Sequence, residues 1–306
     1  MTRATAAAGA VQLLGLAAAP LLPGLVQAIK ARLQGRRGSG ALQPYRELRR
    51  LWSKSSVRVD GASVVYRVAP AVVAASLVVA VLLVPVASAA PGWGVGHDVL
   101  ALAGMLALAR FAITVSSWDV GNGFALMGAS RDLTIAVFTE ATLVLAVAVA
   151  AIGAHSTDLR VMVAATSAGT PWSSAALALA GIAFAIVVVA ETGRQPVDNP
   201  DTHLELTMIH EGPLLEYAGR DLAYLQWAAA ARHWVVLVLA AEIFVPHPAG
   251  VTGQLLILPA TLVVMCAALA VLETLVVKMR ILLAPRLLGV ASVVALCGLA
   301  TTVATR

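Results

Sequence analysis

The sequence predicts an all-α polytopic membrane protein, and three observations support that fold class. Of the 306 residues, 60% are hydrophobic and only 12% are charged, whereas a soluble domain is about 25% charged. Apolar runs recur at about 20 residues, the length that a helix needs to cross the hydrocarbon core of a bilayer. Few aromatic residues and abundant Ala, Val and Leu favour helices over the alternating pattern of a membrane β-barrel.

We expect a single membrane domain, residues 1–306, with about eight transmembrane helices and short cytoplasmic interfacial helices. The first apolar run follows Arg3 as a signal peptide would, but it is too long for the apolar core of one, so we expect it to span the membrane. The predicted spans are 4–29, 64–90, 98–118, 129–152, 173–191, 223–245, 254–275 and 282–303, and the predicted cytoplasmic loops are 30–60, 118–131, 191–222 and 276–282.

Lysine and arginine residues are distributed unevenly between the two sides of this layout. Fifteen lie in segments on one side, and only Arg3, Arg160 and Arg306 lie on the other. Because cytoplasmic loops concentrate Lys and Arg, segment 30–60 is predicted to face the cytoplasm of an inner (plasma) membrane, with both termini outside. A basic loop beside a membrane meets anionic headgroups or a partner protein, so the net charge is poor evidence for nucleic-acid binding.

The sequence offers no redox centre or metal site of its own. Cys266 and Cys297 stand singly inside apolar runs, which excludes a CxxC site and iron–sulfur spacing. His203 and His210 are seven residues apart, but no third ligand accompanies them. We therefore expect no cofactor and no metal bound by this chain.

The segment 191–221, ETGRQPVDNPDTHLELTMIHEGPLLEYAGRD, contains seven of the sixteen acidic residues. Asn199-Pro200 is typical of a helix start, so we predict a helix from Pro200 to about Glu211 that ends at Gly212-Pro213. A second short helix is expected to lead into the sixth span. Leu, Met, Ile and Tyr alternate with the acids, which indicates a partly buried segment; the alternative is an acidic loop that only solvates a cytoplasmic face.

Three further carboxylates, Glu140, Glu242 and Glu273, lie within predicted spans. A charge at the centre of a span costs at least about 2.5–3.5 kcal/mol on insertion scales, so an acid there indicates an ion path. Glu140 is near the middle of its span. The alternative is a neutral carboxyl, or one paired with Arg110 on the preceding span.

Three motifs carry a family resemblance: RRGSGALQPYREL, GASRDLTIAVFTE and ETGRQPVDNPDTHLELTMIHE followed by LEY. Together they resemble the NADH dehydrogenase subunit 1 family. Within that family they are closest to the branch of formate hydrogenlyase subunit 4 and hydrogenase-4 component C, the membrane subunits of complex I-like group 4 [NiFe]-hydrogenases. Ser39, Ser55 and Gly212-Pro213 depart from the family pattern, and the last would bend the segment between Glu205 and Glu216.

The resemblance implies a non-catalytic subunit that docks a hydrophilic redox arm and links its electron transfer to proton translocation. Its partners would be [NiFe] large-subunit-like and iron–sulfur subunits, which carry the iron–sulfur clusters and the [NiFe] centre, and antiporter-like membrane subunits; a bound quinone is possible. The implied proton-path residues are Glu140, Glu191, Glu205, Glu211, Glu216, Glu242 and Glu273. The implied docking residues are Arg32, Arg36, Arg37, Gln43, Pro44, Arg194, Asp198, His203 and His210.

Three other functions remain open from the sequence. A quinone-site subunit of a respiratory NADH dehydrogenase is the nearest alternative. A stand-alone ion transporter is less favoured, because no inverted repeat or paired broken helices are evident. A purely structural anchor would need none of the intramembrane acids.

Overall fold

The chain is described by a computed structural model that covers residues 3–57, 59–86, 96–167, 174–198, 208–248 and 251–305. These residues are almost entirely helical, and a single isolated bridge, Asp98 to Asp158, is the only β pairing among them. The elements are α1 Arg3–Ala18, α2 Leu21–Leu33, α3 Gln43–Trp52, α4 Val64–Leu83, α5 Val99–Val120, α6 Gly123–Ala154, α7 Leu159–Ser167, α8 Ala175–Glu191, η2 Gly212–Leu214, α9 Gly219–Phe244, α10 Val251–Leu275, η3 Ile281–Leu283 and α11 Ala284–Ala304.

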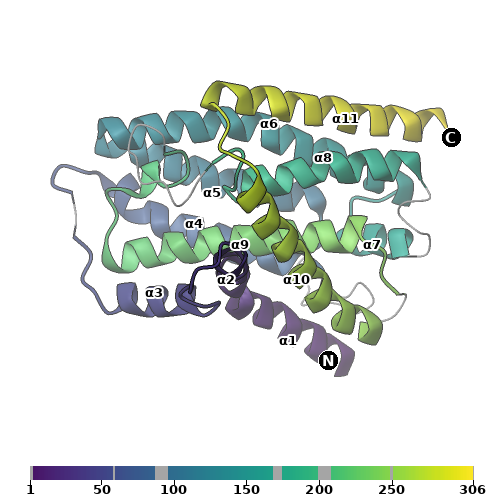
Figure 1. The fold of residues 1–306 in the computed structure, drawn as a ribbon, viewed down its shortest axis with the longest axis horizontal. Coiled ribbons are helices and arrows are strands. Elements are labelled where there is room, and N and C mark those ends of the chain that lie inside the picture. The colour runs from purple at the N-terminus through teal and green to yellow at the C-terminus, as the bar shows by residue number, and fades with distance from the viewer. Residues whose placement is uncertain are drawn as a thin grey trace.

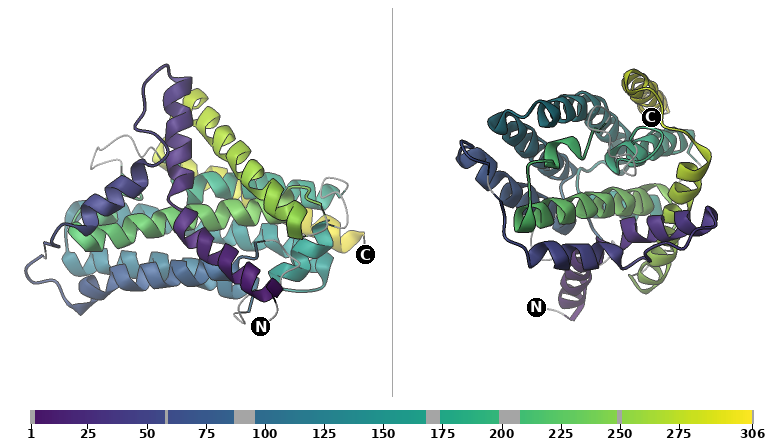
Figure 2. Two further views of the ribbon diagram at one scale, coloured as in Figure 1. Left: turned by 90° about the horizontal axis from the view of Figure 1, so that it is seen from below. Right: turned by 60° about the vertical axis from the view of Figure 1, so that its left-hand side comes forward.

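The long helices form a bundle whose members run along one axis (Figure 1). Helices α4, α5, α6, α8, α9 and α11 follow that axis, whereas α10 crosses it obliquely. Helix α9 is the centre of the bundle, since 78% of its most apolar window is buried against 22% for α11. The right-hand view of Figure 2, in which the α3 end of the bundle is turned forward, shows α9 between its neighbours. Helix α3 lies at one end of the bundle, and both chain termini lie toward the other.

Six helices of the described chain are long and apolar enough to cross a membrane, or seven if α1 and α2 count as one bent span. The predicted all-α multi-span class is therefore confirmed. Of the eight predicted spans, the fifth is the exception in length: α8 has 17 residues, or about 25 Å, a little less than a hydrocarbon core. Helix α7 was not predicted.

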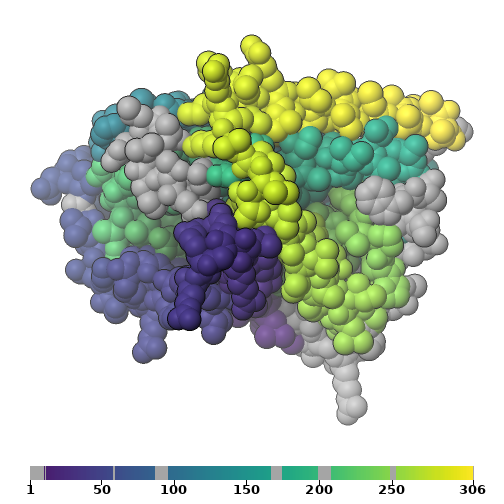
Figure 3. Space-filling view, viewed as in Figure 1, coloured from purple at the N-terminus to yellow at the C-terminus, as the bar shows by residue number. Residues whose placement is uncertain are grey.

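The first span is broken rather than continuous, as a single span 4–29 would have been. Its two parts meet at a bend of 44°, beside Pro20, whose ring nitrogen has no hydrogen to donate to the carbonyl four residues earlier. That carbonyl, Leu16 O, accepts instead from the Trp227 indole at 3.2 Å, and Ala17 O accepts from the Tyr45 hydroxyl at 2.6 Å. Figure 3 shows α2 and α10 side by side on one face.

Helix α8 ends about halfway along the bundle, and η2, which belongs to the acidic segment after α8, lies in the other half (Figure 1). The turn η2 packs on α6 and α5. Gly212 makes this possible, because a Cβ there would stand 2.8 Å from the Cα of Gly128 on α6. The short α8 thus leaves a space that the acidic segment partly fills.

The predicted helices within this segment need correction. Residues 199–207, which include most of the helix expected from Pro200, lie outside the described residues. Met208–Glu211 are not helical, and the second helix is reduced to one 3-10 turn at η2. Helix α9 begins at Gly219, four residues before the predicted sixth span. The backbone of Gly219, at φ +55°, approaches Ser55 O so closely that a Cβ would lie 2.5 Å from it.

Candidate functional site: a buried ion cluster beside a cavity

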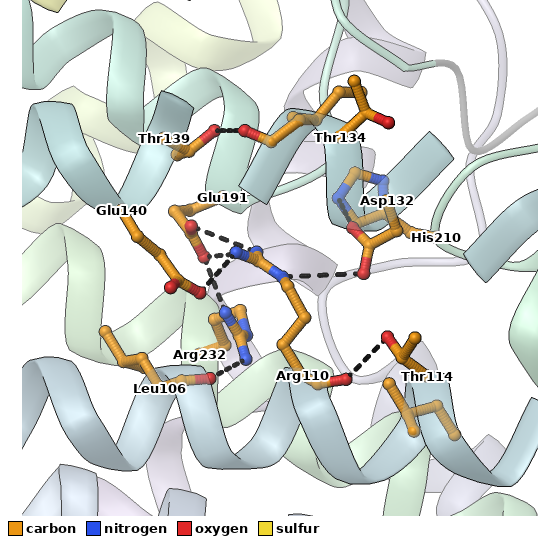
Figure 4. Close-up of polar contacts among 12 residues, drawn as sticks. Leu106, Arg110, Thr114, Asp132, Thr134, Thr139, Glu140, Glu191, His210 and Arg232 are labelled. Carbon is orange, nitrogen blue, oxygen red and sulfur yellow. Dashed lines mark hydrogen bonds and ion pairs between the residues drawn. The ribbon is translucent and has the colours of Figure 1, made fainter. Parts of the chain in front are cut away.

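Arg110, at the middle of α5, is the centre of a buried ion cluster (Figure 4). Its guanidinium donates to Glu140 of α6 at 2.9 Å and to both carboxylate oxygens of Glu191 at 3.0 and 3.1 Å. Its Nε stands 3.5 Å from Asp132, also on α6. One cation therefore joins three carboxylates, which the planar fork of an arginine makes possible.

A second arginine completes this cluster from α9. Arg232 donates to Glu191 at 2.7 Å and to the Leu106 carbonyl at 2.9 Å. We use the name cavity cluster for Arg110, Asp132, Glu140, Glu191 and Arg232. With three carboxylates and two arginines, the cluster has one acid more than it has cations.

A chain of polar contacts connects the cavity cluster to the acidic segment. His210 Nδ1 lies 2.9 Å from Asp198, and His210 Nε2 lies 3.6 Å from Asp132. On the other side of Asp198, the Lys278 ammonium is 3.0 Å away. This chain runs from the loop after α10, through the acidic segment, to the middle of the bundle.

The charges in this series of contacts shift the pKa values of Asp198 and His210, both in the acidic segment. Burial opposes the ionised form of Asp198, but the hydrogen bond with His210 and the Lys278 ammonium outweigh it and lower the pKa of Asp198 to about 2. Burial also opposes the imidazolium of His210, yet Asp198 and Asp132 together raise the pKa of His210 above its ordinary value. Asp198 is thus a carboxylate at neutral pH, and a proton on His210 is favoured.

A cavity of about 660 Å³ lies beside the cluster, within the range of small-molecule sites. Apolar residues of α4 and α9, including Val73, Leu77 and Leu225, form part of its wall. The polar part of the wall contains Arg110, Asp132, Glu191, Asp198, His210, Glu211 and Arg232. The structure therefore brings ionisable groups and an apolar wall to one cavity.

The far end of the acidic segment is fixed to the bundle by aromatic and amide contacts. Tyr66 donates to the Glu216 carbonyl at 2.6 Å, and its ring stacks on Tyr217 at 4.5 Å between centroids. Tyr217 donates in return to the Tyr66 carbonyl at 3.1 Å. The Asn122 amide, which begins α6, donates to the Glu216 carboxylate. Glu216 is therefore at the end of α6 and apart from Arg110.

Glu273 belongs to a different buried cluster. It pairs with Lys30 of α2 and Arg194 of the segment after α8, each at 3.0 Å. All three side chains are at most 6% exposed, and none of them lines the cavity. We use the name dry cluster for Lys30, Arg194 and Glu273.

The remaining predicted site residues fall in four groups. Glu242 lies near the C-terminal end of α9, with His247 Nε2 3.9 Å from its carboxylate. Arg32, Arg36 and Arg37 are exposed, and Gln43 and Pro44 are half-buried, as docking residues can be. Arg194, Asp198 and His210, which we also expected to dock a partner, instead contact residues of this chain in its interior. Glu205 and His203 lie outside the described residues.

Sequence reasoning missed Asp132, Arg232, Lys30 and Lys278. Arg232 could have been predicted, because it is a lone cation within an apolar span. The same argument, that an ionisable residue within a span indicates a functional site, selected Glu140. Asp132 stands in the GASRD part of a family motif, but its position relative to Arg110 depends on how α5 and α6 pack. The pairing of Glu140 with Arg110, considered from the sequence as an alternative, is present. Among the described residues, no three His, Cys, Asp or Glu side chains are placed to hold a metal ion.

The fold and this site define a class: an all-helical, multi-span membrane protein whose centre holds ion pairs beside a cavity. The family model described as NADH dehydrogenase matches residues 6–303, and the chain belongs to that family, the NADH dehydrogenase subunit 1 family. The resemblance seen in the three motifs is thereby confirmed.

The similar proteins include members of two branches. The chain is 33% identical over 281 residues to formate hydrogenlyase subunit 4 of Escherichia coli, covering 89% of this chain and 90% of that one. It is 34% identical over 230 residues to hydrogenase-4 component C of the same organism, covering 74% and 71%. Identity to an NADH-quinone oxidoreductase subunit of Salinibacter ruber is 24% over 238 residues, covering 72% and 68%.

A solved structure has the same fold. A chain of the membrane-bound sulfane sulfur reductase, an archaeal respiratory membrane complex, superposes with a TM-score of 0.84 over 95% of this chain and 97% of that chain. The two are 18% identical, so this similarity concerns the fold alone.

Proposed function

We propose that this chain is the membrane-anchor and coupling subunit of a complex I-like, membrane-bound [NiFe]-hydrogenase or formate hydrogenlyase-type complex. It docks the hydrophilic redox arm and links electron transfer there to proton translocation. The observation that carries the proposal is the cavity cluster, in which Arg110 joins Glu140, Glu191 and Asp132 halfway along the bundle. The higher identity to hydrogenase-branch subunits favours a hydrogenase partner over a quinone reductase.

The direction of the path follows from exposure. Glu191 is buried, whereas the Glu140 side chain is 33% exposed midway along α6. An ionisable group at that depth is unfavourable against lipid, so a neighbouring membrane subunit, of antiporter-like type, would cover it. Protons would enter from the acidic segment, pass the cavity cluster and leave toward that neighbour at Glu140.

Docking of the redox arm would use the exposed basic segment after α2. The uneven distribution of Lys and Arg supports a cytoplasmic position for this segment, in an inner membrane with both termini outside. Arg32, Arg36 and Arg37 are exposed there, and the arginine fork suits carboxylates on a partner subunit. The iron–sulfur clusters and the [NiFe] centre would reside in the partner subunits.

The test of coupling is Glu140→Gln, measured in vesicles that contain the native complex. Gln keeps the volume and one hydrogen bond to Arg110 but cannot take up or release a proton, so we expect an unchanged complex yield with proton uptake per donor oxidised reduced at least several-fold. Glu140→Asp, which still titrates, should retain part of the uptake. Unchanged coupling in the Gln variant would make Glu140 structural and would refute the proposed path.

The test of docking is the double variant Arg36→Ala and Arg37→Ala. We expect the hydrophilic arm to separate from the membrane arm during purification, while this subunit stays inserted. Arg49→Ala with Lys54→Ala removes the same charge from exposed positions further along the segment, and this control should leave the complex intact. If both variants purify as intact complexes in equal yield, the segment only contacts lipid.

The cavity supports a second candidate, a quinone-site subunit of a respiratory NADH dehydrogenase. The cavity has an apolar wall from α4 and α9 opposite polar groups. This lining suits a quinone, which has an apolar tail and a polar headgroup. Extraction of the purified complex and analysis of its bound lipids for quinone separates the two candidates, since the hydrogenase-type function needs none.

A further inference from the structure

His210 holds the acidic segment to the bundle through two carboxylates on different elements. Asp198 Oδ2 accepts both from the backbone N–H of His210 at 3.3 Å and from its Nδ1 at 2.9 Å. On the other edge of the ring, Nε2 faces Oδ1 of Asp132 on α6 at 3.6 Å. The ring lies over Gly193, where a Cβ would be 3.1 Å from Nδ1.

The contact with Asp132 is incomplete. A separation of 3.6 Å is longer than a hydrogen bond, and neither His210 Nε2 nor Asp132 Oδ1 has a hydrogen-bond partner among the described residues, although both atoms are buried. Two facing, buried polar atoms without partners are unfavourable, because each has lost its hydrogen bonds to water without replacing them. A small movement of the segment toward α6 would pair them, provided that Nε2 carries a proton.

The protonation state of the ring decides whether that pair can form. Neutral imidazole has one N–H, and the neighbouring Asp198 carboxylate requires it at Nδ1. The lone pair of Nε2 would then face the Asp132 carboxylate, and two acceptors repel. Only the imidazolium donates to both acids, which agrees with the raised pKa of His210.

The groups around His210 leave room for one more positive charge. Two charged groups face His210 from the bundle: Arg110 on α5 and Asp132 on α6. Asp198 faces it from the segment after α8, and Lys278, in the loop after α10, binds Asp198 in turn. Nearby in the sequence, Glu211 is the next residue, and Arg131 donates to the Met208 carbonyl. The cavity cluster together with Asp198 and Lys278 contains four carboxylates and three fixed cations. A proton on His210 makes that group neutral.

We propose that His210 is a proton-binding site that fastens the acidic segment to α6: with the proton bound, Nε2 donates to Asp132, and without it this contact opens. The proposal rests on the proposed function, because it gives the coupling path an entry point. The same ring also lines the cavity. A partner that displaces the segment would therefore change the proton affinity of His210, and protonation of His210 would in turn change the segment's position.

The experiment measures the position of the segment directly, in the purified complex. Spin labels at Ser130→Cys on α6 and Leu215→Cys on the segment occupy exposed positions, in a Cys297→Ser background that removes the exposed native thiol. In the protein with His210 we expect the ratio of the longer-distance to the shorter-distance population to rise about tenfold per pH unit, with the two populations equal at a midpoint higher than about 6.5.

Two variants of His210 make the outcome decisive. His210→Arg keeps a permanent charge with donors for both acids, so its distance should stay short at every pH. His210→Gln cannot be charged, and its distance should not depend on pH. His155→Asn removes a titratable ring from an exposed, left-handed position that Asn tolerates, and this control should retain the pH dependence.

The outcomes separate this inference from the proposed function. If the pH-dependent distance persists in the Arg or Gln variant, or is absent with His210 in place, His210 is not the proton-binding site. Either result leaves the vesicle test on Glu140 unaffected. Conversely, unchanged coupling in Glu140→Gln refutes the proposed path even if the distance depends on His210.

Discussion

The cavity cluster and the dry cluster both bury ionisable groups in the bundle, but they balance charge in opposite ways. In the cavity cluster, three carboxylates share two arginines beside a cavity of about 660 Å³. In the dry cluster, one fully enclosed carboxylate, Glu273, lies between Lys30 and Arg194. An acid held by two cations has no reason to take up a proton, whereas an excess of acids around shared cations leaves one that can.

This difference refines the rule that an acid within a span indicates an ion path. By that rule alone Glu140, Glu242 and Glu273 were equivalent. The structure separates them by their partners: Glu140 shares a cation with other acids, Glu273 has two cations, and Glu242 has a histidine at 3.9 Å. The comparison therefore predicts three different results when each acid is neutralised.

The largest expected effect is that of Glu273→Gln on stability. Neutralising this acid leaves Lys30 and Arg194 buried side by side without their shared counter-charge, and breaking a buried ion pair in this way costs about 3–5 kcal/mol. We expect a large loss in the yield of assembled complex and a lower midpoint of thermal unfolding in detergent. Thr274→Ala, at the half-buried neighbouring position, should change neither quantity.

One experimental result would instead support a role for Glu273 in proton transfer. If Glu273→Gln assembles with the native yield and melting midpoint but loses proton uptake, the two cations do not fix its charge. The contrast between the two clusters would then be wrong.

The sequence predicted much of the fold and about half of the site, and the reason for the division is physical. Long apolar runs determine helices by composition alone, so α4, α5, α9, α10 and α11 appear close to their predicted ranges. The break at Pro20 was readable too, since proline removes a hydrogen-bond donor. Which cation meets which acid depends on packing between distant helices, as for Arg110 with Glu191, 81 positions apart, and no local pattern specifies it.

An intermediate effect is expected for Arg232→Lys. The ammonium keeps the charge beside Glu191, but one compact group cannot reproduce contacts at both Glu191 and the Leu106 carbonyl. We expect a loss of about 1.5–3 kcal/mol in stability, the scale of one hydrogen bond to a charged group, with the complex still assembled. Proton uptake per donor oxidised should fall by less than in Glu140→Gln, measured in the same vesicles.

Arg232→Gln sharpens this test within the cavity cluster. Removing the charge leaves Arg110 as the one cation for three carboxylates, so coupling should fall further than in the Lys variant. If Lys and Gln behave alike, the charge of Arg232 is irrelevant and its role is to hold the Leu106 carbonyl.

The smallest effect is expected for Glu242→Gln. Glu242 is ten residues beyond Arg232 on α9, about 15 Å along the helix, and its carboxylate lies 3.9 Å from His247 Nε2, too far for a hydrogen bond. Only a space of about 10 Å³ adjoins the pair, close to the volume of a single water. Neutralising Glu242 leaves the cations of the cavity cluster and of the dry cluster paired with the acids of those clusters. We therefore expect native complex yield and native proton uptake per donor oxidised, with a stability change below about 1 kcal/mol. A loss of uptake as large as in Glu140→Gln would mean that protons travel along α9 to its far end, and the path would then leave the subunit at Glu242 rather than at Glu140.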